Sequence, residues 1–171
     1  MLYIIQFKQI PTYYVMTEEC SNKDIRYMDI AGYEASKSKV TYKHGCIAVV
    51  SGKIVARGCN SYRTYSSDGM ISGTCTCHAE VDVLRQCKKQ NITKKITLYI
   101  ARITNMNTLN CSVPCINCYN TMKDFGIKRV IYSDRDGELT KTAMSDFIST
   151  FNSSGQKAIN AKRVRFLNYS T

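Results

Sequence analysis

Two short segments, a His-x-Glu pattern and a Pro-Cys-x-x-Cys pattern further along the chain, constrain the fold of this protein most. The His-x-Glu pattern contains His78 and Glu80, and the Pro-Cys-x-x-Cys pattern contains Pro114, Cys115 and Cys118. Imidazole and thiolate are ligands that zinc prefers, and a catalytic zinc ion takes three protein ligands and keeps a fourth position open. Cys115 and Cys118 are one turn apart at the start of a predicted helix, so both sulfurs can face one point. The fold must therefore bring the two segments together around one metal ion.

Glu80 is expected to work beside the metal ion rather than to bind it. It follows His78 by two positions, about 200° around a helix, so its carboxylate can stand next to a metal-bound water. Zinc lowers the pKa of such a water towards neutrality, and a nearby carboxylate can accept the proton. Either pattern alone would be weak, because a lone Cys-x-x-Cys is also typical of redox and structural sites. The prediction depends on both patterns occurring together.

The chain has nine cysteines, an odd number that argues against a secreted disulfide framework and favours a reducing, cytoplasmic environment. Besides the two ligands named above, the sequence leaves open a second, structural zinc site built from Cys75, Cys77, Cys111 or His44, although Cys-x-Cys spacing suits tetrahedral closure poorly. The alternative is that these thiols pack as small apolar groups and that His44 lies at a strand start or on the surface.

Length and composition indicate one globular domain, residues 1–171, with its core at about 22–151. Of its residues 44% are hydrophobic and 22% are charged, and no apolar run is long enough for a membrane span, so no membrane partner is expected. The first seven residues are apolar but lack a basic leader and a cleavage site, which is typical of mature protein. The net charge of +11 favours phosphate-bearing partners, either nucleotides or nucleic acid, or else reflects only a Lys-rich proteome.

Hydrophobic periodicity and turn residues predict helices that alternate with strands. Helices are expected at 21–35, 77–91, 117–125 and 140–151, strands at 45–50, 53–59, 97–101 and 129–132, and peripheral strands at 1–16 and 164–167. A loop at 60–76 and a polar insert at 102–110 interrupt this pattern. The helix that joins strands 97–101 and 129–132 makes those two strands parallel. The order predicts an α/β fold in which a mixed sheet begins with a hairpin and has helices on both faces.

Together these motifs resemble the cytidine and deoxycytidylate deaminase superfamily, from about residue 22 to about residue 151. The resemblance is carried by the two metal-ligand patterns and by segments 45–60, 77–84, 97–100 and 126–132. Histidine as the first ligand is similar to the deoxycytidylate and tRNA-adenosine branches. The resemblance implies a three-layer α-β-α fold with a five-stranded sheet, a homo-oligomer and a Zn2+ cofactor. It also implies hydrolytic deamination by zinc-bound hydroxide, with Glu80 as the proton shuttle.

The resemblance further implies contacts to the substrate. Asn60 matches an asparagine that binds the sugar, and the backbone of Ala79 matches a contact to the base. Arg63, in loop 60–76, is either a ligand for a 5′-phosphate or a solvated loop residue. Tyr132 either stacks near the base or is a buried strand tyrosine. The stretch 102–113 is longer than in many relatives and adjoins the second metal motif.

Three functions are consistent with these observations. The one that we expect is a zinc-dependent hydrolase of a pyrimidine nucleotide, which converts dCMP to dUMP. The second is a base deaminase that acts on nucleic acid, on tRNA adenosine or on cytidine in single-stranded DNA or RNA, for which the positive charge would supply affinity. The third is a non-catalytic zinc-binding module. Glu80 argues against this third function, because a structural zinc site has no need of it.

Overall fold

The computed structural model describes residues 18–164 of the chain. In chain order its elements are α1 (Asn22–Ser36), β1 (Lys43–Val50), β2 (Lys53–Cys59), α2 (Ala79–Lys89), β3 (Thr97–Ile103), β4 (Leu109–Asn110), α3 (Ile116–Asp124), β5 (Arg129–Ser133), β6 (Leu139–Ala143) and α4 (Ser154–Asn160). The first three predicted helices and the four main predicted strands are confirmed to within a few residues.

The strands form one mixed sheet in the order β2-β1-β3-β5-β6, and β4 pairs with β3. β1 pairs antiparallel with both β2 and β3, whereas β3 and β5 are parallel and are connected through α3. β6 returns antiparallel to β5 at the edge of the sheet. The predicted hairpin, the parallel crossover and the α/β class are thus confirmed.

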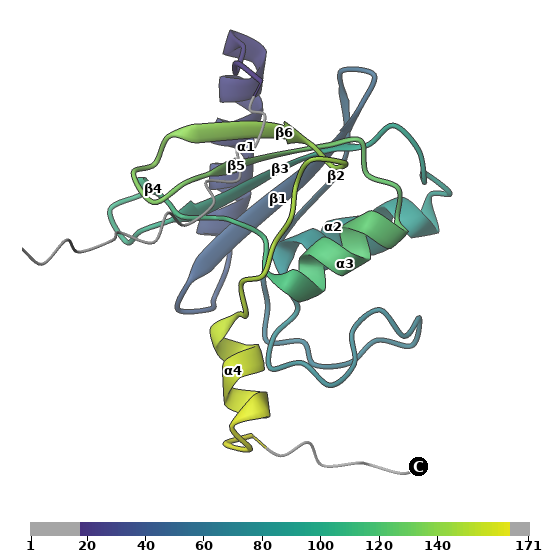
Figure 1. The fold of residues 1–171 in the computed structure, drawn as a ribbon, viewed down its shortest axis with the longest axis vertical. Helices are drawn as coiled ribbons and strands as arrows, with labels where there is room; N and C mark the ends of the chain where they lie inside the picture. The colour runs from purple at the N-terminus through teal and green to yellow at the C-terminus, as the bar shows by residue number, and fades with distance from the viewer. Residues whose placement is uncertain (1–17, 165–171) are drawn as a thin grey trace, which may run out of the picture.

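Side chains that alternate along each strand divide the core into two layers. In β1, Cys46 and Ala48 face a cluster that contains Val83 of α2 and Met122 of α3. Ile47, between them, faces a second cluster that is formed with residues of α1. As Figure 1 shows, α1 covers one face of the sheet, and α2 and α3 cover the other. The three-layer arrangement follows from this alternation.

Asp24 fastens α1 to the sheet. It forms a capping box with Ser21, whose backbone N–H donates to Asp24 Oδ2 at 2.9 Å. Its other oxygen accepts a 2.6 Å hydrogen bond from the hydroxyl of Tyr99 on β3, and Nζ of Lys141 on β6 lies 3.1 Å from Oδ2. Burial alone would raise the pKa of this carboxyl, but the hydrogen bonds from Tyr99, Ser21 and Lys141 lower it to about 2. The charged form of Asp24 therefore joins one helix to two strands.

The C-terminal region differs from the single amphipathic helix expected at 140–151, and that prediction is wrong. Leu139–Ala143 form strand β6, and α4 begins only at Ser154. The turn at 134–137, where Gly137 has φ 84°, reverses the chain directly after β5. Pairing with the open edge of β5 gives the backbone of β6 its hydrogen bonds, so this segment does not need a helix to satisfy them. α4 lies beyond the end of the sheet, near loop 60–76 (Figure 1).

The polar insert at 102–110 is a short hairpin rather than an unstructured loop. Its ends pair across β3 and β4, Arg102 with Asn110 and Ile103 with Leu109. Inside it, the backbone N–H of Thr104 donates to the carbonyl of Thr108 at 2.9 Å. The insert therefore extends β3 and leads the chain back towards the second metal motif.

The two peripheral strands that the sequence predicts, at 1–16 and 164–167, lie outside the described residues, except for Val164, which is in no strand. None of the helices between residues 18 and 164 has both the length and the apolar character that crossing a membrane requires.

Candidate functional site

His78 and Cys115 occupy equivalent positions, each at the N-cap of a helix. His78 precedes α2 and Cys115 precedes α3, both with extended backbone (ψ 153° and 167°), and neither side chain caps its own helix. Both side chains are therefore available to a ligand. Helix N-termini carry partial positive charge and unpaired N–H groups, so the same arrangement stabilises thiolates nearby.

Three ligating atoms meet where these helices begin. Nδ1 of His78 lies 3.2 Å from Sγ of Cys118 and 3.5 Å from Sγ of Cys115, and all three atoms lie within 4.8 Å of one another. In a tetrahedral zinc site with Zn–N of about 2.0 Å and Zn–S of about 2.3 Å, nitrogen and sulfur are about 3.5 Å apart. The spacing and the chemistry of the three donors therefore fit a zinc ion.

The charges of these three side chains depend on one another. The hydrogen bond from Cys118 and the proximity of His78 lower the pKa of Cys115 to about 4, although burial opposes the shift. Burial would lower the pKa of His78, but its hydrogen bond with Cys115 and the charge of Glu80 raise it to about 9. The hydrogen bond to Cys115, together with burial, raises the pKa of Cys118. A thiolate at Cys115 is thus favoured at neutral pH, as a metal ligand requires.

Glu80 lies in the first turn of α2 and is only 4% exposed. It is not one of the three clustered metal-ligand candidates. Burial raises the pKa of its carboxyl, while the charge of His78 opposes the rise. A carboxyl whose pKa is raised by burial holds a proton more readily than a solvated one, which suits a general acid–base group.

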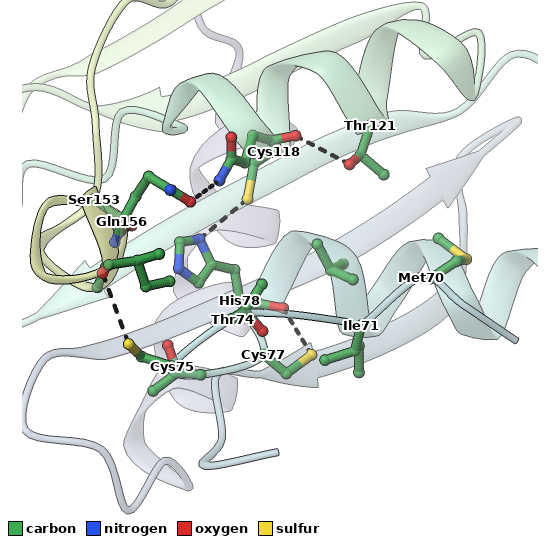
Figure 2. Close-up of a pocket in the computed structure, with 15 residues that line it drawn as sticks. Met70, Ile71, Thr74, Cys75, Cys77, His78, Cys118, Thr121, Ser153 and Gln156 are labelled. Atoms are coloured by element: carbon green, nitrogen blue, oxygen red, sulfur yellow. Dashed lines mark hydrogen bonds between the residues drawn. The ribbon is translucent and has the colours of Figure 1, made fainter. Parts of the chain in front are cut away.

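A pocket of about 90 Å³ opens next to His78 and Cys118 (Figure 2). Its walls come from three parts of the chain: the end of loop 60–76 with the start of α2, the first turns of α3, and α4. Ile71, Val81 and Ile159 give it apolar surface, and threonine and amide side chains give it polar surface. Apolar walls with a few polar groups are typical of sites for small organic ligands.

Loop 60–76 is held both at its ends and in its middle. Ser61 and Cys77 exchange two backbone hydrogen bonds of 3.0 and 2.9 Å, which close the loop just before His78. In the middle, Asp68 accepts a 2.7 Å hydrogen bond from Nε of Arg85, a buried residue of α2. Hydrogen bonds from Ser66 and Arg85 lower the pKa of Asp68 to about 2. In the sequence, the only signal for this ion pair is an arginine on the apolar face of a predicted helix.

α4 closes the pocket from the C-terminal side. Nδ2 of Asn117, which lies between the two cysteine ligands in sequence, donates a 2.8 Å hydrogen bond to Oε1 of Gln156. Sγ of Cys75 also contacts the carbonyl of Gly155 at 3.7 Å. The available sequence signal for this helix is Ser153-x-x-Gln156, a capping-box pattern. The Ser153 side chain indeed accepts from the backbone N–H of Gln156 at 3.2 Å.

None of the four predicted substrate contacts lines this pocket. Asn60 is buried, and its side-chain amide bonds to the backbone N–H of His44 (2.9 Å) and the carbonyl of Tyr42 (2.7 Å). Ala79 is fully buried as the first residue of α2. Their roles towards a substrate stay predictions.

The other two predicted contacts lie in contrasting surroundings. Arg63 is exposed and has no ion pair within 4.0 Å among residues 18–164. Tyr132 is 8% exposed, and its ring centroid lies 5.5 Å from that of Phe147. Burial raises the pKa of Tyr132. The environment of Tyr132 favours the alternative of a buried strand tyrosine.

His44 lies at the start of β1 with Nδ1 3.0 Å from the carbonyl of Tyr42. Burial lowers the pKa of His44 to about 4. Within the described part of the chain, His78, Cys115 and Cys118 are the one group of three or more His, Cys, Asp or Glu side chains close enough to share a metal ion. The described residues therefore contain no second group of ligands of the kind that another zinc site would need.

Comparison with known proteins agrees with this geometry. Residues 21–134 match the sequence profile of the cytidine and deoxycytidylate deaminase zinc-binding region. The fold is similar to that of cytidine deaminase from Burkholderia pseudomallei, with 17% identity, a TM-score of 0.54, and coverage of 74% of this chain and 98% of that one. It is also similar to dCMP deaminase from the cyanophage S-TIM5, solved with dCMP and dUMP, with 22% identity, a TM-score of 0.50, and coverage of 69% and 85%.

No curated protein sequence gives a significant match to the chain. The profile match spans the hairpin, both metal-ligand patterns and the parallel crossover, and the three donors fit the zinc ion for which that family region is named. Members of this family are hydrolases that remove an amino group. The chain belongs to the cytidine and deoxycytidylate deaminase family and is a zinc-type deaminase.

Proposed function

We propose that this protein hydrolyses the amino group of a pyrimidine nucleotide, converting dCMP and water to dUMP and ammonia. The observation that carries the proposal is the meeting of His78, Cys115 and Cys118 beside the buried carboxyl of Glu80, in a family defined by cytidine and deoxycytidylate deaminases. The dCMP deaminase of cyanophage S-TIM5 has a similar fold and supports this choice of substrate.

His78, Cys115 and Cys118 would hold the zinc ion, and Glu80 would move the protons. When bound, zinc would supply a water acidic enough to be deprotonated near neutral pH. The Glu80 carboxylate would accept that proton and deliver it to the ring nitrogen next to the amine-bearing carbon. It would then take the proton of the hydroxyl added to that carbon and pass it to the amine, which leaves as ammonia while the ring C=O forms. Burial of Glu80 keeps bulk water from competing for the proton.

Three side chains or backbone groups are proposed to hold the rest of the substrate. Asn60 would bind the sugar, and the backbone of Ala79 would contact the base. Arg63 would hold the 5′-phosphate, because its guanidinium is exposed and unpaired among the described residues and lies in the loop that ends at His78. Arg63→Ala should then raise KM for dCMP more than KM for deoxycytidine, which has no phosphate.

The direct test is ammonia release from a panel of substrates. Zinc-loaded protein is given dCMP, CMP, deoxycytidine, cytidine, cytosine, a tRNA anticodon stem-loop and single-stranded DNA. We expect the largest kcat/KM for dCMP. Turnover of a free base or nucleoside in preference to dCMP would contradict the substrate assignment, and no turnover of any of these would contradict the proposed activity. Light scattering on the same preparation tests the homo-oligomer that the family resemblance implies.

A nucleic-acid base remains the second candidate substrate, and two observations favour it. The chain carries a net charge of +11, and in loop 60–76 Tyr62 and Tyr65 are 63% and 70% exposed on either side of Arg63. Exposed aromatic rings next to arginine can stack the bases of a single strand. Deamination of an oligonucleotide with affinity that falls steeply with salt would favour this candidate over dCMP.

A further inference from the structure

His44, at the start of β1, and Asn60, directly after β2, are joined through both backbone and side chains. The backbone N–H of Asn60 donates to the carbonyl of His44 at 3.0 Å, and the N–H of His44 donates to Oδ1 of Asn60 at 2.9 Å. Both side chains also bind one further atom, the carbonyl oxygen of Tyr42. Nδ2 of Asn60 lies 2.7 Å from that oxygen and Nδ1 of His44 lies 3.0 Å from it. The imidazole ring and the amide therefore lie side by side.

The His44 ring is on the side of the sheet that carries the metal-ligand candidates. Side chains alternate along a strand, so His44 shares its face with Cys46 and Ala48, which pack against α2 and α3. Loop 60–76 follows β2 directly, and the pairing of its two ends brings the chain back to His78. The two rings are close enough for the charge of His78 to lower the pKa of His44, in addition to the larger effect of burial.

One ring nitrogen of His44 has no partner. A carbonyl oxygen can only accept, so Nδ1 carries the proton that it donates to Tyr42, and Nε2 keeps a lone pair. Nε2 has no hydrogen-bond partner among residues 18–164, and it is not one of the unpaired side-chain atoms that are buried there, so it retains accessible surface. Because burial lowers the pKa of His44 to about 4, the ring is neutral at pH 7. His44 therefore presents an accessible acceptor beside Asn60.

A sugar hydroxyl needs such a neighbour next to Asn60. A hydroxyl both accepts and donates, so full pairing requires one donor and one acceptor from the protein. The Asn60 amide has a second N–H to offer, but its oxygen already accepts from the backbone of His44. In dCMP the 3′-hydroxyl is the one free hydroxyl of the sugar, because the 5′ position carries the phosphate and the 2′ position carries hydrogen. The proton of that hydroxyl requires an acceptor other than Asn60.

We propose that Nε2 of His44 accepts a hydrogen bond from the 3′-hydroxyl of the nucleotide, next to the contact that Asn60 makes with the sugar. This inference rests on the proposed function, because it concerns the sugar of that same substrate. The 3′-hydroxyl is present in both dCMP and dUMP, so substrate and product should both make the bond. A nucleotide inside a strand has a phosphodiester at this position and no proton to donate, so His44 favours free nucleotides over nucleic acid.

The test is titration calorimetry with dUMP and with 2′,3′-dideoxy-UMP, which lacks only the 3′-hydroxyl. The unmodified, zinc-loaded protein should bind dUMP about 5–20-fold more tightly than the dideoxy nucleotide. His44→Asn keeps an amide that can reach the Tyr42 carbonyl but has no acceptor at the position of Nε2, and its preference for dUMP should fall to about threefold or less. His44→Gln places an amide oxygen near that position and should regain most of the preference.

The dideoxy nucleotide is the internal control, because a variant with a disturbed fold would lose affinity for both ligands. Equal binding of the two nucleotides by the unmodified protein would overturn the role of His44, and so would an equal loss of both in His44→Asn. Turnover of dCMP is measured separately, so either result leaves the proposed function intact. If the unmodified protein neither binds dUMP nor turns over dCMP, the proposed function fails first, and the role of His44 fails with it.

Discussion

Asn117, which lies between two metal-ligand cysteines, donates a 2.8 Å hydrogen bond to Gln156 on the C-terminal helix α4. One bond therefore links the first turn of α3, next to the metal centre, to the segment that closes the pocket. Gln156 also donates a 2.8 Å bond to Asn160 one turn further along α4.

Gln156→Ala should loosen this closing segment without altering the metal ligands. We expect KM for the substrate to rise about 3–10-fold, because one hydrogen bond that positions the pocket wall is lost, and kcat to change less. Steady-state kinetics measures both constants. Ser154→Ala, an exposed position on the same helix outside the pocket lining, is the control. An equal rise in KM for both variants would argue against a specific role for the Asn117–Gln156 bond.

Cys115→Ser should abolish zinc binding, because a serine hydroxyl is a poor replacement for a thiolate ligand. Atomic absorption should find about one zinc ion per chain in the unmodified protein and far less in the variant. Cys111→Ser is the control, since Cys111 is not among the clustered ligand candidates, and it should retain zinc. Zinc retained by Cys115→Ser would mean that another residue completes the site.

Removal of zinc should lower thermal stability, because the metal ion binds the folded state in preference to the unfolded chain. With free zinc at about a thousand times Kd the stabilisation is about 4 kcal/mol, so a chelator should lower the Tm by about 8–16 °C. Differential scanning fluorimetry with and without chelator measures the change. The Cys115→Ser variant provides the baseline, because its Tm should not respond to chelator.

Glu80→Gln should leave zinc content unchanged and reduce kcat about 10²–10⁴-fold, since an amide has a similar shape but cannot carry the proton. Metal analysis and ammonia release on the same sample separate the two effects. Loss of zinc together with activity would show that Glu80 holds the metal centre together rather than moving protons.

Helix α1, the β1–β2 hairpin and the parallel crossover from β3 to β5 could be predicted from the sequence, because each depends on local periodicity and turn residues. The metal ligands could be read as well, because ligand chemistry allows few residue types at few spacings. Strand β6 was not predicted, because Thr140 and Thr142 fit a helical pattern in the sequence. In the structure, pairing with the free edge of β5 determines their conformation instead. The Asp136-Gly137 pair was the available signal for a hairpin there.

The pocket could not be read from the sequence for a different reason. Its walls come from loop 60–76, α3 and α4, and only the tertiary fold brings Thr74 and Gln156 into the wall of the same pocket. For Asn60 the motif indicated only a contact to the sugar. The structure adds hydrogen bonds from its side chain to the backbone at the start of β1.

The stability of this protein should depend on pH through Asp24. The pKa of its carboxyl is lowered in the folded state to about 2 from an ordinary value of 3.8, because the hydrogen bonds from Tyr99 and Ser21 outweigh the effect of burial. A lowered pKa means that the carboxylate stabilises the fold above the ordinary value, and that this contribution is lost as pH falls from about 4 through 2.

Asp24→Asn should therefore cost about 2 kcal/mol of unfolding free energy at pH 7, and progressively less as the pH falls below 4. Urea denaturation at pH 7 and pH 3 measures the difference. Asp29→Asn, an exposed position on the same helix, is the control and should have little effect at either pH. A cost for Asp24→Asn that is the same at both pH values would contradict the role of the charge.

α4 lies outside the segment that matches the family profile, which ends at residue 134. The metal-ligand candidates and the C-terminal wall of the pocket beside them therefore lie in separate parts of the chain. Substitutions at 153–159 leave the metal ligands unchanged, so selection can alter substrate preference without altering the reaction. Transferring residues 153–159 to another member of the family would show how much of the substrate preference depends on this segment.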